Sequence, residues 1–369
     1  MAVILWSVLI LSFTYAALGL ASWMRKRSRM VRLAEQLPGP TQSPFPLFES
    51  TVLMSECQGV ARCRKVDSFA IAYCMGMAVC RLDLDKGVTR FWLAFKPVVL
   101  LTSPYTVESM LTNTKNLDKS DEYFVFEPWL GQGLVTSKRN KWQFRRKILT
   151  PAFHFRILAE QLPIINNEAT RLVQKLSNKR YSKGQRTDIV PLVTQCTLDS
   201  ICETAMGVKV DCQADENESQ YVRALYEVGE NALARVARPW MWPDFVFYRT
   251  DYGRKFVKAR DYMHSFTRGV IEKRKAEWEE ILEKTGSSDD KMTLDEIMQL
   301  KYGQTSHKQM VFLDLLLHQH LIEKTMTLND VQEEVDTFMF AVSLIIDDLR
   351  KHSLYFPLDD SRPIPIEIH

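Results

Sequence analysis

Apolar residues recur with helical spacing along four long stretches of the chain, and polar or proline-containing turns separate these stretches. Residues three and four apart share one face of a helix, so each stretch predicts an amphipathic helix that packs on one side against a core. The stretches are 157–176, 190–206, 221–236 and 251–284. Two shorter, mostly apolar runs, Arg90–Leu93 and Pro97–Leu101, indicate strands. The pattern therefore predicts a mainly α fold with a small β sheet.

Capping residues mark the starts of two further helices. Ser103 precedes Pro104, an order that suits an N-cap followed by the first helical position. Thr327 precedes the last recognisable helix, where its hydroxyl group and the Asp330 carboxylate suit the free amides and the positive end of the helix dipole. Between the helical runs, the polar stretch 285–307 indicates a surface loop.

The first 24 residues contain no charged side chain. A helix of that length can cross a lipid bilayer, and Trp6 and Trp23 stand near its ends, where indole rings favour the interface. The basic run Arg25–Arg29 follows directly, which by the positive-inside tendency holds the rest of the chain in the cytosol. A cleaved secretory signal is the alternative, with small residues at 17, 19 and 21, but its positive charge normally precedes the apolar core. We expect an uncleaved, single-pass anchor.

Charge and cysteine content narrow the class of partners. The net charge is only +3, which gives no reason to expect nucleic acid as a partner. Seven cysteines on the cytosolic side of a membrane would stay reduced.

Trp142 and Arg146 are the candidate binding residues, although one helical turn between an indole and a guanidinium also fits a packed ring beside a solvated charge. Glu168 and Arg171 have the spacing of an ion pair on a surface helix, and Asp314 with His318 indicates a polar pair rather than a metal site. We predict no metal-ligating residue.

Ordered motifs over about two-thirds of the chain resemble one enzyme family. The segments are Trp142–Arg146, Leu149–Phe155, Leu198–Gly207, Phe312–Leu317 and Glu334–Ala341. Together they are similar to microsomal cytochromes P-450 of the fatty-acid omega-hydroxylase clade, family 4. The resemblance implies an NADPH-dependent reductase as electron donor, an apolar substrate such as a fatty acid, and an endoplasmic reticulum membrane. It also implies that Trp142 and Arg146 donate to a haem propionate.

The chain departs from this family in the middle of its last motif. Val342–Ile346 occupy the places where the family has the residues that deliver protons to oxygen, and no cysteine follows Cys212. The family's haem needs a thiolate ligand from a later loop. We therefore expect no catalytic residue in this chain, no stable haem binding, and no monooxygenase activity.

These features divide the chain into an anchor (1–24), a basic stop-transfer segment and proline hinge (25–40), a divergent segment (41–89), a partial cytochrome P-450 domain (90–341) and a divergent tail (342–369). Two other interpretations stay open. The chain is a splice or gene-model fragment, or it is a regulatory isoform that occupies the reductase through the cations Arg139, Lys141, Arg145 and Lys147.

Overall fold

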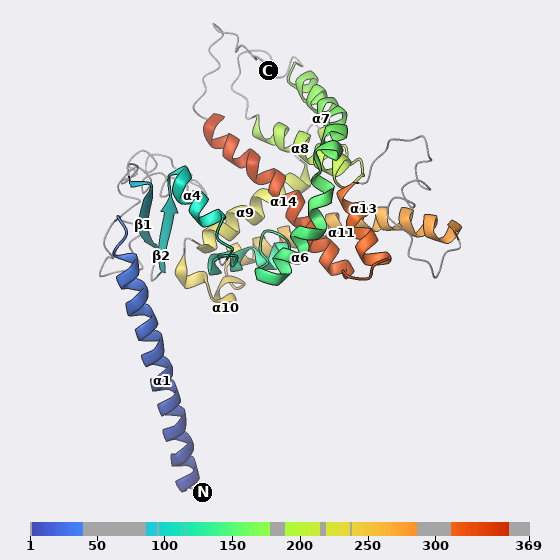
Figure 1. Cartoon of the computed structure of the whole chain (residues 1–369). Helices are drawn as coiled ribbons and strands as arrows, with labels where there is room; N and C mark the ends of the chain where they lie inside the picture. Colours follow the sequence, from blue (N-terminus) through green and yellow to red (C-terminus); the bar gives the residue numbers. More distant parts are fainter. Residues whose placement is uncertain are drawn as a thin grey trace. The chain divides into compact units, whose positions relative to one another are not determined.

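The computed structural model describes residues 2–39, 86–93, 96–114, 116–177, 189–214, 219–236, 238–285 and 311–353 (Figure 1). The chain divides into two compact units, Met1–Leu117 with Leu233–Asp244 and Asp118–Ala232 with Phe245–His369. Most of the divergent segment, the predicted polar loop beyond residue 285 and the tail beyond residue 353 lie outside the described residues. The predicted division at residues 24, 40, 89 and 341 remains a prediction.

The first unit contains a long helix and a two-stranded sheet. β1 (Val88–Leu93) pairs antiparallel with β2 (Lys96–Leu101), with Val88 opposite Leu101. The proline hinge is tied to β1, because the Arg90 amide donates to the Pro38 carbonyl at 2.8 Å. α4 (Pro104–Leu111) begins as predicted, with the Ser103 hydroxyl accepting from the Thr106 amide at 3.5 Å. The small sheet and this cap are confirmed.

α1 (Ala2–Ala34) is one continuous helix that passes through the basic run instead of ending before it. Among the described residues, none of the helices combines the length and the apolar character needed to cross a membrane. The structure thus does not confirm the predicted single-pass crossing.

The second unit is helical, and two of its helices share residues with the first unit. The helices are α5 (Glu127–Leu130), α6 (Arg139–Leu149), α7 (Phe155–Leu176), α8 (Val190–Thr204), α9 (Gln220–Val236), α10 (Asp244–Phe247), α11 (Asp251–Thr285), α13 (Phe312–Leu321) and α14 (Leu328–Ser353). The four helices predicted from periodicity are confirmed as α7, α8, α9 and α11. α8 ends two residues earlier than predicted, close to Gly207, whose positive φ of 67° favours the end of a helix.

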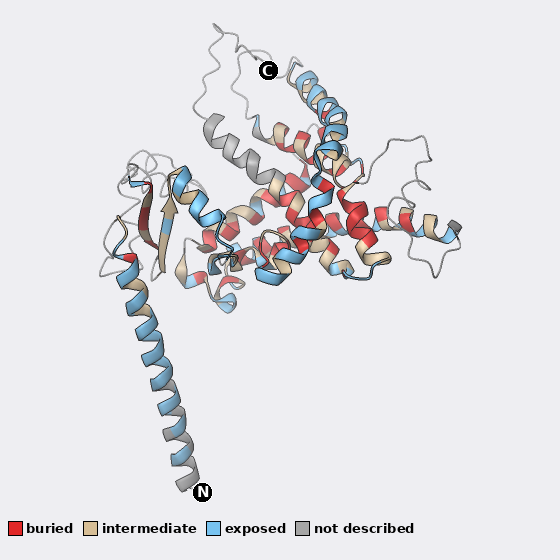
Figure 2. Ribbon diagram, viewed as in Figure 1, coloured by how far each residue is buried: buried red, intermediate tan, exposed pale blue. Residues whose placement is uncertain are grey.

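α14 lies at the centre of the second unit and packs against α5, α8, α11 and α13. Its apolar residues Val331, Val335 and Met339, spaced four apart, are fully buried, and Figure 2 shows other buried residues gathered along α8 and α11. Burying such a side chain stabilises the fold by about 1.5–3 kcal/mol. α14 is therefore the element against which the candidate site is positioned.

Candidate functional site

The two residues predicted as the binding pair lie together on α6. The guanidinium carbon of Arg146 is 5.2 Å from the centroid of the Trp142 ring, a cation–π contact. Arg146 is exposed and Trp142 is half-buried. The structure thus brings the predicted pair together on an accessible face, where its N–H groups are able to bind an acidic ligand.

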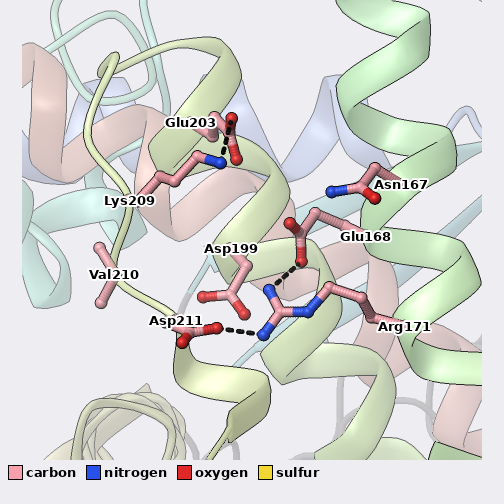
Figure 3. Close-up of a pocket in the computed structure, with 8 residues that line it drawn as sticks. All are labelled: Asn167, Glu168, Arg171, Asp199, Glu203, Lys209, Val210 and Asp211. Carbon is pink, nitrogen blue, oxygen red and sulfur yellow. Dashed lines mark hydrogen bonds and ion pairs between the residues drawn. The ribbon is translucent and has the colours of Figure 1, made fainter. Parts of the chain in front are cut away.

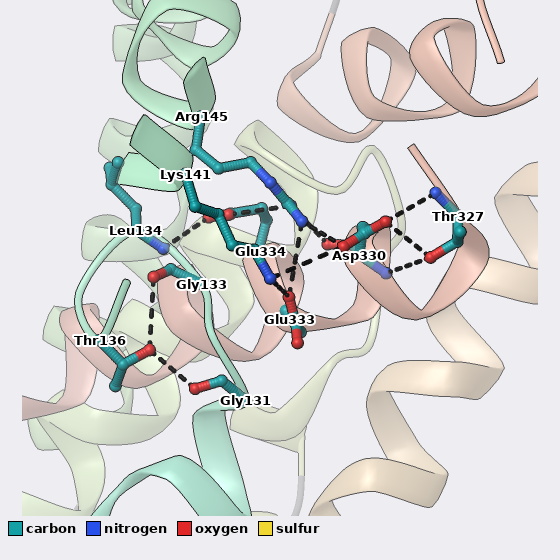
Figure 4. Close-up of polar contacts among 10 residues, drawn as sticks. All are labelled: Gly131, Gly133, Leu134, Thr136, Lys141, Arg145, Thr327, Asp330, Glu333 and Glu334. Carbon is teal, nitrogen blue, oxygen red and sulfur yellow. Dashed lines mark hydrogen bonds and ion pairs between the residues drawn. The ribbon is translucent and has the colours of Figure 1, made fainter. Parts of the chain in front are cut away.

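The neighbouring Arg145 is the charged residue on α6 that sequence reasoning misplaced. It is buried, and its Nη1 donates to the Glu334 carboxylate at 3.1 Å and to the Asp330 carbonyl at 3.0 Å (Figure 4). Its Nη2 donates to the Asp330 carboxylate as well. One guanidinium therefore joins α6 to the first two turns of α14.

Lys141 and a helix cap complete this α6–α14 network. Lys141 Nζ lies 3.0 Å from the Glu333 carboxylate and 3.8 Å from that of Asp330. The predicted cap is confirmed, since the Thr327 amide and hydroxyl both donate to Asp330, at 2.8 and 2.7 Å, and the Asp330 amide donates back to the hydroxyl at 3.2 Å. Asp330 therefore both caps the helix and pairs with Arg145 and Lys141. Burial alone would raise its pKa, but the Thr327 hydrogen bonds and the two cations hold the pKa below the ordinary value.

Glu334 is the most deeply buried carboxyl group of the network. It accepts from the Leu134 amide at 3.1 Å in addition to Arg145. Burial raises the pKa of Glu334 to about 7, while Arg145 and the Leu134 amide pull the pKa down. The close approach of this loop to α14 needs glycine, since a Cβ at Gly133 would lie 2.6 Å from the Glu333 carbonyl oxygen.

The structure changes one member of the proposed reductase-facing surface. Arg145 is 3% exposed and paired with Glu334, so it is not available to a partner. Lys141 lies 3.0 Å from Glu333. Arg139 pairs with Asp118 but is 75% exposed, and Lys147 is exposed as well. For these three cations the regulatory interpretation remains a hypothesis.

A second buried acid lies two residues further along α14. The Asp336 carboxylate is 3.6 Å from His264 Nε2 on α11, and that nitrogen lies 2.6 Å from the Trp129 carbonyl oxygen. Since a carbonyl group only accepts, Nε2 carries the proton. Burial raises the pKa of Asp336 to about 7 and lowers that of His264. The Oδ1 atom of Asp336 is buried and has no hydrogen-bond partner.

Asp314 is a structural anchor between α11 and α13. It accepts two hydrogen bonds from Arg274, both at 2.8 Å, and one from the Trp278 indole at 2.7 Å. Asp314 is fully buried, and the predicted polar pair with His318 remains a prediction beside these contacts to Arg274 and Trp278. The sequence offered no signal for this, because Arg274 lies 40 residues away.

A polar pocket of about 360 Å³ opens beside α7 and α8 (Figure 3). The predicted ion pair is present, with Arg171 Nη1 2.9 Å from the Glu168 carboxylate, but Glu168 is buried rather than on the surface. Asp199 accepts from the Cys212 and Gln213 amides at 2.7 and 2.9 Å. The charged lining is thus engaged in holding the loop after α8, and the pocket offers no separate binding chemistry.

The described cysteines do not suit the thiolate ligand that a haem of the predicted kind needs. Cys196, Cys202 and Cys212 are all buried, and burial raises the pKa of Cys196 and Cys202. A thiol whose pKa is raised stays protonated and is a poor metal ligand. Contact of Trp142 and Arg146 with the acidic edge of a haem remains a prediction, and the described cysteines do not fit the thiolate ligand.

Comparisons with known proteins agree with the motifs. The family model for cytochrome P450 matches residues 85–343. The chain is 34% identical over 334 residues to cytochrome P450 4c3 of Drosophila melanogaster, covering 87% of this chain and 56% of the relative. It is 38% identical over 252 residues to human cytochrome P450 4V2, covering 68% and 45%. The chain spans about half the length of the curated relatives that it matches.

Proposed function

The chain belongs to the cytochrome P450 family, and from that premise we propose that its 369 residues form the scaffold of a family 4 monooxygenase without the reaction centre. In the complete reaction, one oxygen atom is inserted into a C–H bond of a fatty acid or a similar apolar substrate. An NADPH-dependent reductase is the proposed electron donor. When bound through a cysteine thiolate, haem supplies the oxygen chemistry.

The state of the cysteines supports this proposal. Residues 213–369 contain no cysteine, and Cys196, Cys202 and Cys212 are buried. Trp142 and Arg146 are the residues proposed to hold the acidic edge of a haem.

The test is the carbon monoxide difference spectrum of reduced membranes that contain the 369-residue chain, with total haem measured in parallel. Complete human cytochrome P450 4V2, expressed in the same way, serves as the control. We expect the band of thiolate-ligated haem in the control and no such band from this chain. A thiolate-type band from this chain would overturn the proposal.

We also propose that α1 attaches the protein to the endoplasmic reticulum membrane. Its support is the exposed apolar surface of α1, which includes Trp6, Phe13 and Trp23, followed directly by Arg25 and its basic neighbours. Separation of membranes from cytosol, with and without an alkaline carbonate wash, tests the attachment. Full recovery of the chain in the unwashed cytosolic fraction would refute it.

A further inference from the structure

Three helices of the second unit meet at the side chain of His264. Its Nε2 atom, which carries the proton, lies 2.6 Å from the Trp129 carbonyl oxygen on α5 and 3.6 Å from the Asp336 carboxylate on α14. The backbone at this position of α11 is bound as well, since the Gln332 side-chain amide donates to the His264 carbonyl at 3.1 Å. We call Trp129, His264 and Asp336 the three-helix junction.

One N–H group of the junction faces two acceptors. A distance of 2.6 Å is that of a hydrogen bond, whereas 3.6 Å is too long for one, so His264 donates to the Trp129 carbonyl. A small rotation of the imidazole ring would bring the N–H group to the Asp336 carboxylate instead. Charge decides between the two acceptors, because a hydrogen bond to an ionised group is roughly twice as strong as one between neutral groups.

The two titratable side chains differ in their access to water. The His264 side chain is 28% exposed, whereas that of Asp336 is 4% exposed and its Oδ1 atom is buried without a hydrogen-bond partner. A buried carboxyl group with an unpartnered oxygen favours its neutral form, because the charge is poorly solvated. Burial accordingly raises the pKa of Asp336 to about 7, so its charge changes near neutral pH.

Charged and titratable groups from three helices surround the junction. They are Arg260, Asp261 and Arg268 of α11, Glu333 of α14 and Tyr221 of α9. Burial raises the pKa of Tyr221 well above its ordinary value, so this residue stays neutral near pH 7. At Asp336, Arg268 lowers the pKa and Glu333 raises it, and burial is a larger cause than either. The charge of Asp336 is therefore controlled mainly by its own burial.

We propose that His264 is a proton-controlled switch between α5 and α14. While Asp336 is protonated, the Nε2–H group of His264 stays on the Trp129 carbonyl and ties α5 to α11. When Asp336 gives its proton to water, the carboxylate takes over that N–H group, and α5 loses this hydrogen bond. The Trp129 and Phe340 rings stay in contact, with centroids 4.7 Å apart, so α5 loosens locally and does not detach from α14.

The loosening should be visible in the backbone amides of residues 127–134, which form α5 and the loop that follows it. Hydrogen–deuterium exchange of the 369-residue chain, followed by mass spectrometry at pH 6 and pH 8, measures it. Each rate is expressed as a protection factor, which corrects for the intrinsic effect of pH on amide exchange. α13 is the internal control, because a different pair, Asp314 with Arg274, holds it to α11.

We expect the protection of residues 127–134 to fall about tenfold from pH 6 to pH 8, since one proton with a folded-state pKa of about 7 is lost over this range. The protection of α13 should change far less. Constant protection of residues 127–134 would overturn the proposal. An equal fall in α13 would overturn it too, because the whole unit would then be unfolding.

Two matched variants assign the effect to Asp336. Asp336→Asn cannot ionise, so its α5 should keep at pH 8 the protection that the parent has at pH 6. Asp261→Asn changes an exposed acid on α11 and should retain the tenfold fall of the parent. Equal pH dependence in Asp336→Asn and the parent, or loss of the pH dependence in Asp261→Asn, would reject the role of Asp336.

A third variant tests the hydrogen bond itself. His264→Phe keeps a ring on α11 but has no N–H group for either acceptor. We expect low protection of residues 127–134 at both pH values, with α13 still protected as the sign of a folded chain. Protection at pH 6 equal to that of the parent would show that the His264 bond does not hold α5, and the switch would be refuted.

Discussion

Removing the guanidinium of Arg145 should be among the most damaging single changes on α6. In Arg145→Met, the fully buried Glu334 loses the cation 3.1 Å from its carboxylate. At that distance a pair of unit charges interacts by about 5 kcal/mol for an effective dielectric constant of 20, and breaking a buried pair costs about 3–5 kcal/mol. Lys141 stays beside Glu333 and Asp330 and offsets part of the loss. We therefore expect a decrease of about 3 kcal/mol in the free energy of unfolding.

Urea unfolding followed by tryptophan fluorescence measures this decrease, and Arg139→Met is the matched control. Arg139 lies on the same helix and also pairs with an acid, but the pair is exposed, so its loss should shift the urea midpoint far less. The double variant Arg145→Met with Glu334→Gln removes both charges and should recover much of the stability. Equal midpoints for the two single variants, or a double variant whose losses simply add, would refute this account of the network.

The pH dependence gives an independent check. Burial raises the folded-state pKa of Glu334 to about 7, above its unfolded value of about 4.5, so the folded state binds the proton more tightly. Without Arg145 the pKa of Glu334 in the folded state rises further, because the cation that stabilises the charged carboxylate is gone. The stability lost in Arg145→Met should therefore be largest well above pH 7, where Glu334 is charged in both folded proteins. It should shrink as pH falls through the variant's higher pKa to about 7, and change little below pH 7, where Glu334 is protonated in both. A loss that does not change with pH would contradict the assignment of Glu334 as the stranded charge.

Three further changes probe other parts of the second unit. Asp336→Asn should stabilise the chain at pH 8 by up to about 4 kcal/mol, because burial raises the pKa of Asp336 to about 7, and the gain should vanish as pH falls toward 4, measured by urea unfolding. Gly133→Ala should lower the thermal midpoint because its Cβ would lie 2.2 Å from the Thr337 hydroxyl, whereas Gly229→Ala, with open space around it, should raise the midpoint. Asp314→Asn should cost about 3–5 kcal/mol in urea, because it removes the charge that pairs with a buried guanidinium.

Helix positions could be predicted from the sequence because they depend on local periodicity. The residues 157–176 and 251–284 show an apolar period of 3.6, and the helices α7 and α11 begin and end within two residues of them. The Ser103 and Thr327 caps are equally local, since each side chain binds an amide within three residues. Such features need no knowledge of the tertiary structure.

Charge pairing could not be predicted in the same way. The acids at the start of α14 already have a local explanation, because Asp330, Glu333 and Glu334 suit the positive end of a helix dipole. Their partner Arg145 is 189 residues from Glu334, and no sequence pattern links the two. Trp142 and Arg146 could be found only because a family motif names them, since their spacing alone also fits a surface pair.

The α6–α14 network shows which contacts position the central helix α14. Arg145 and Lys141 of α6 bind the acidic residues in the first turns of α14. The Leu134 amide, in the loop before α6, also donates to Glu334. All of these contacts join protein groups. The next turns are held by buried apolar residues such as Val335 and Met339. Both sets of contacts join protein groups, and the buried charges of Arg145 and Glu334 neutralise each other. The start of the central helix is therefore positioned by contacts within the chain.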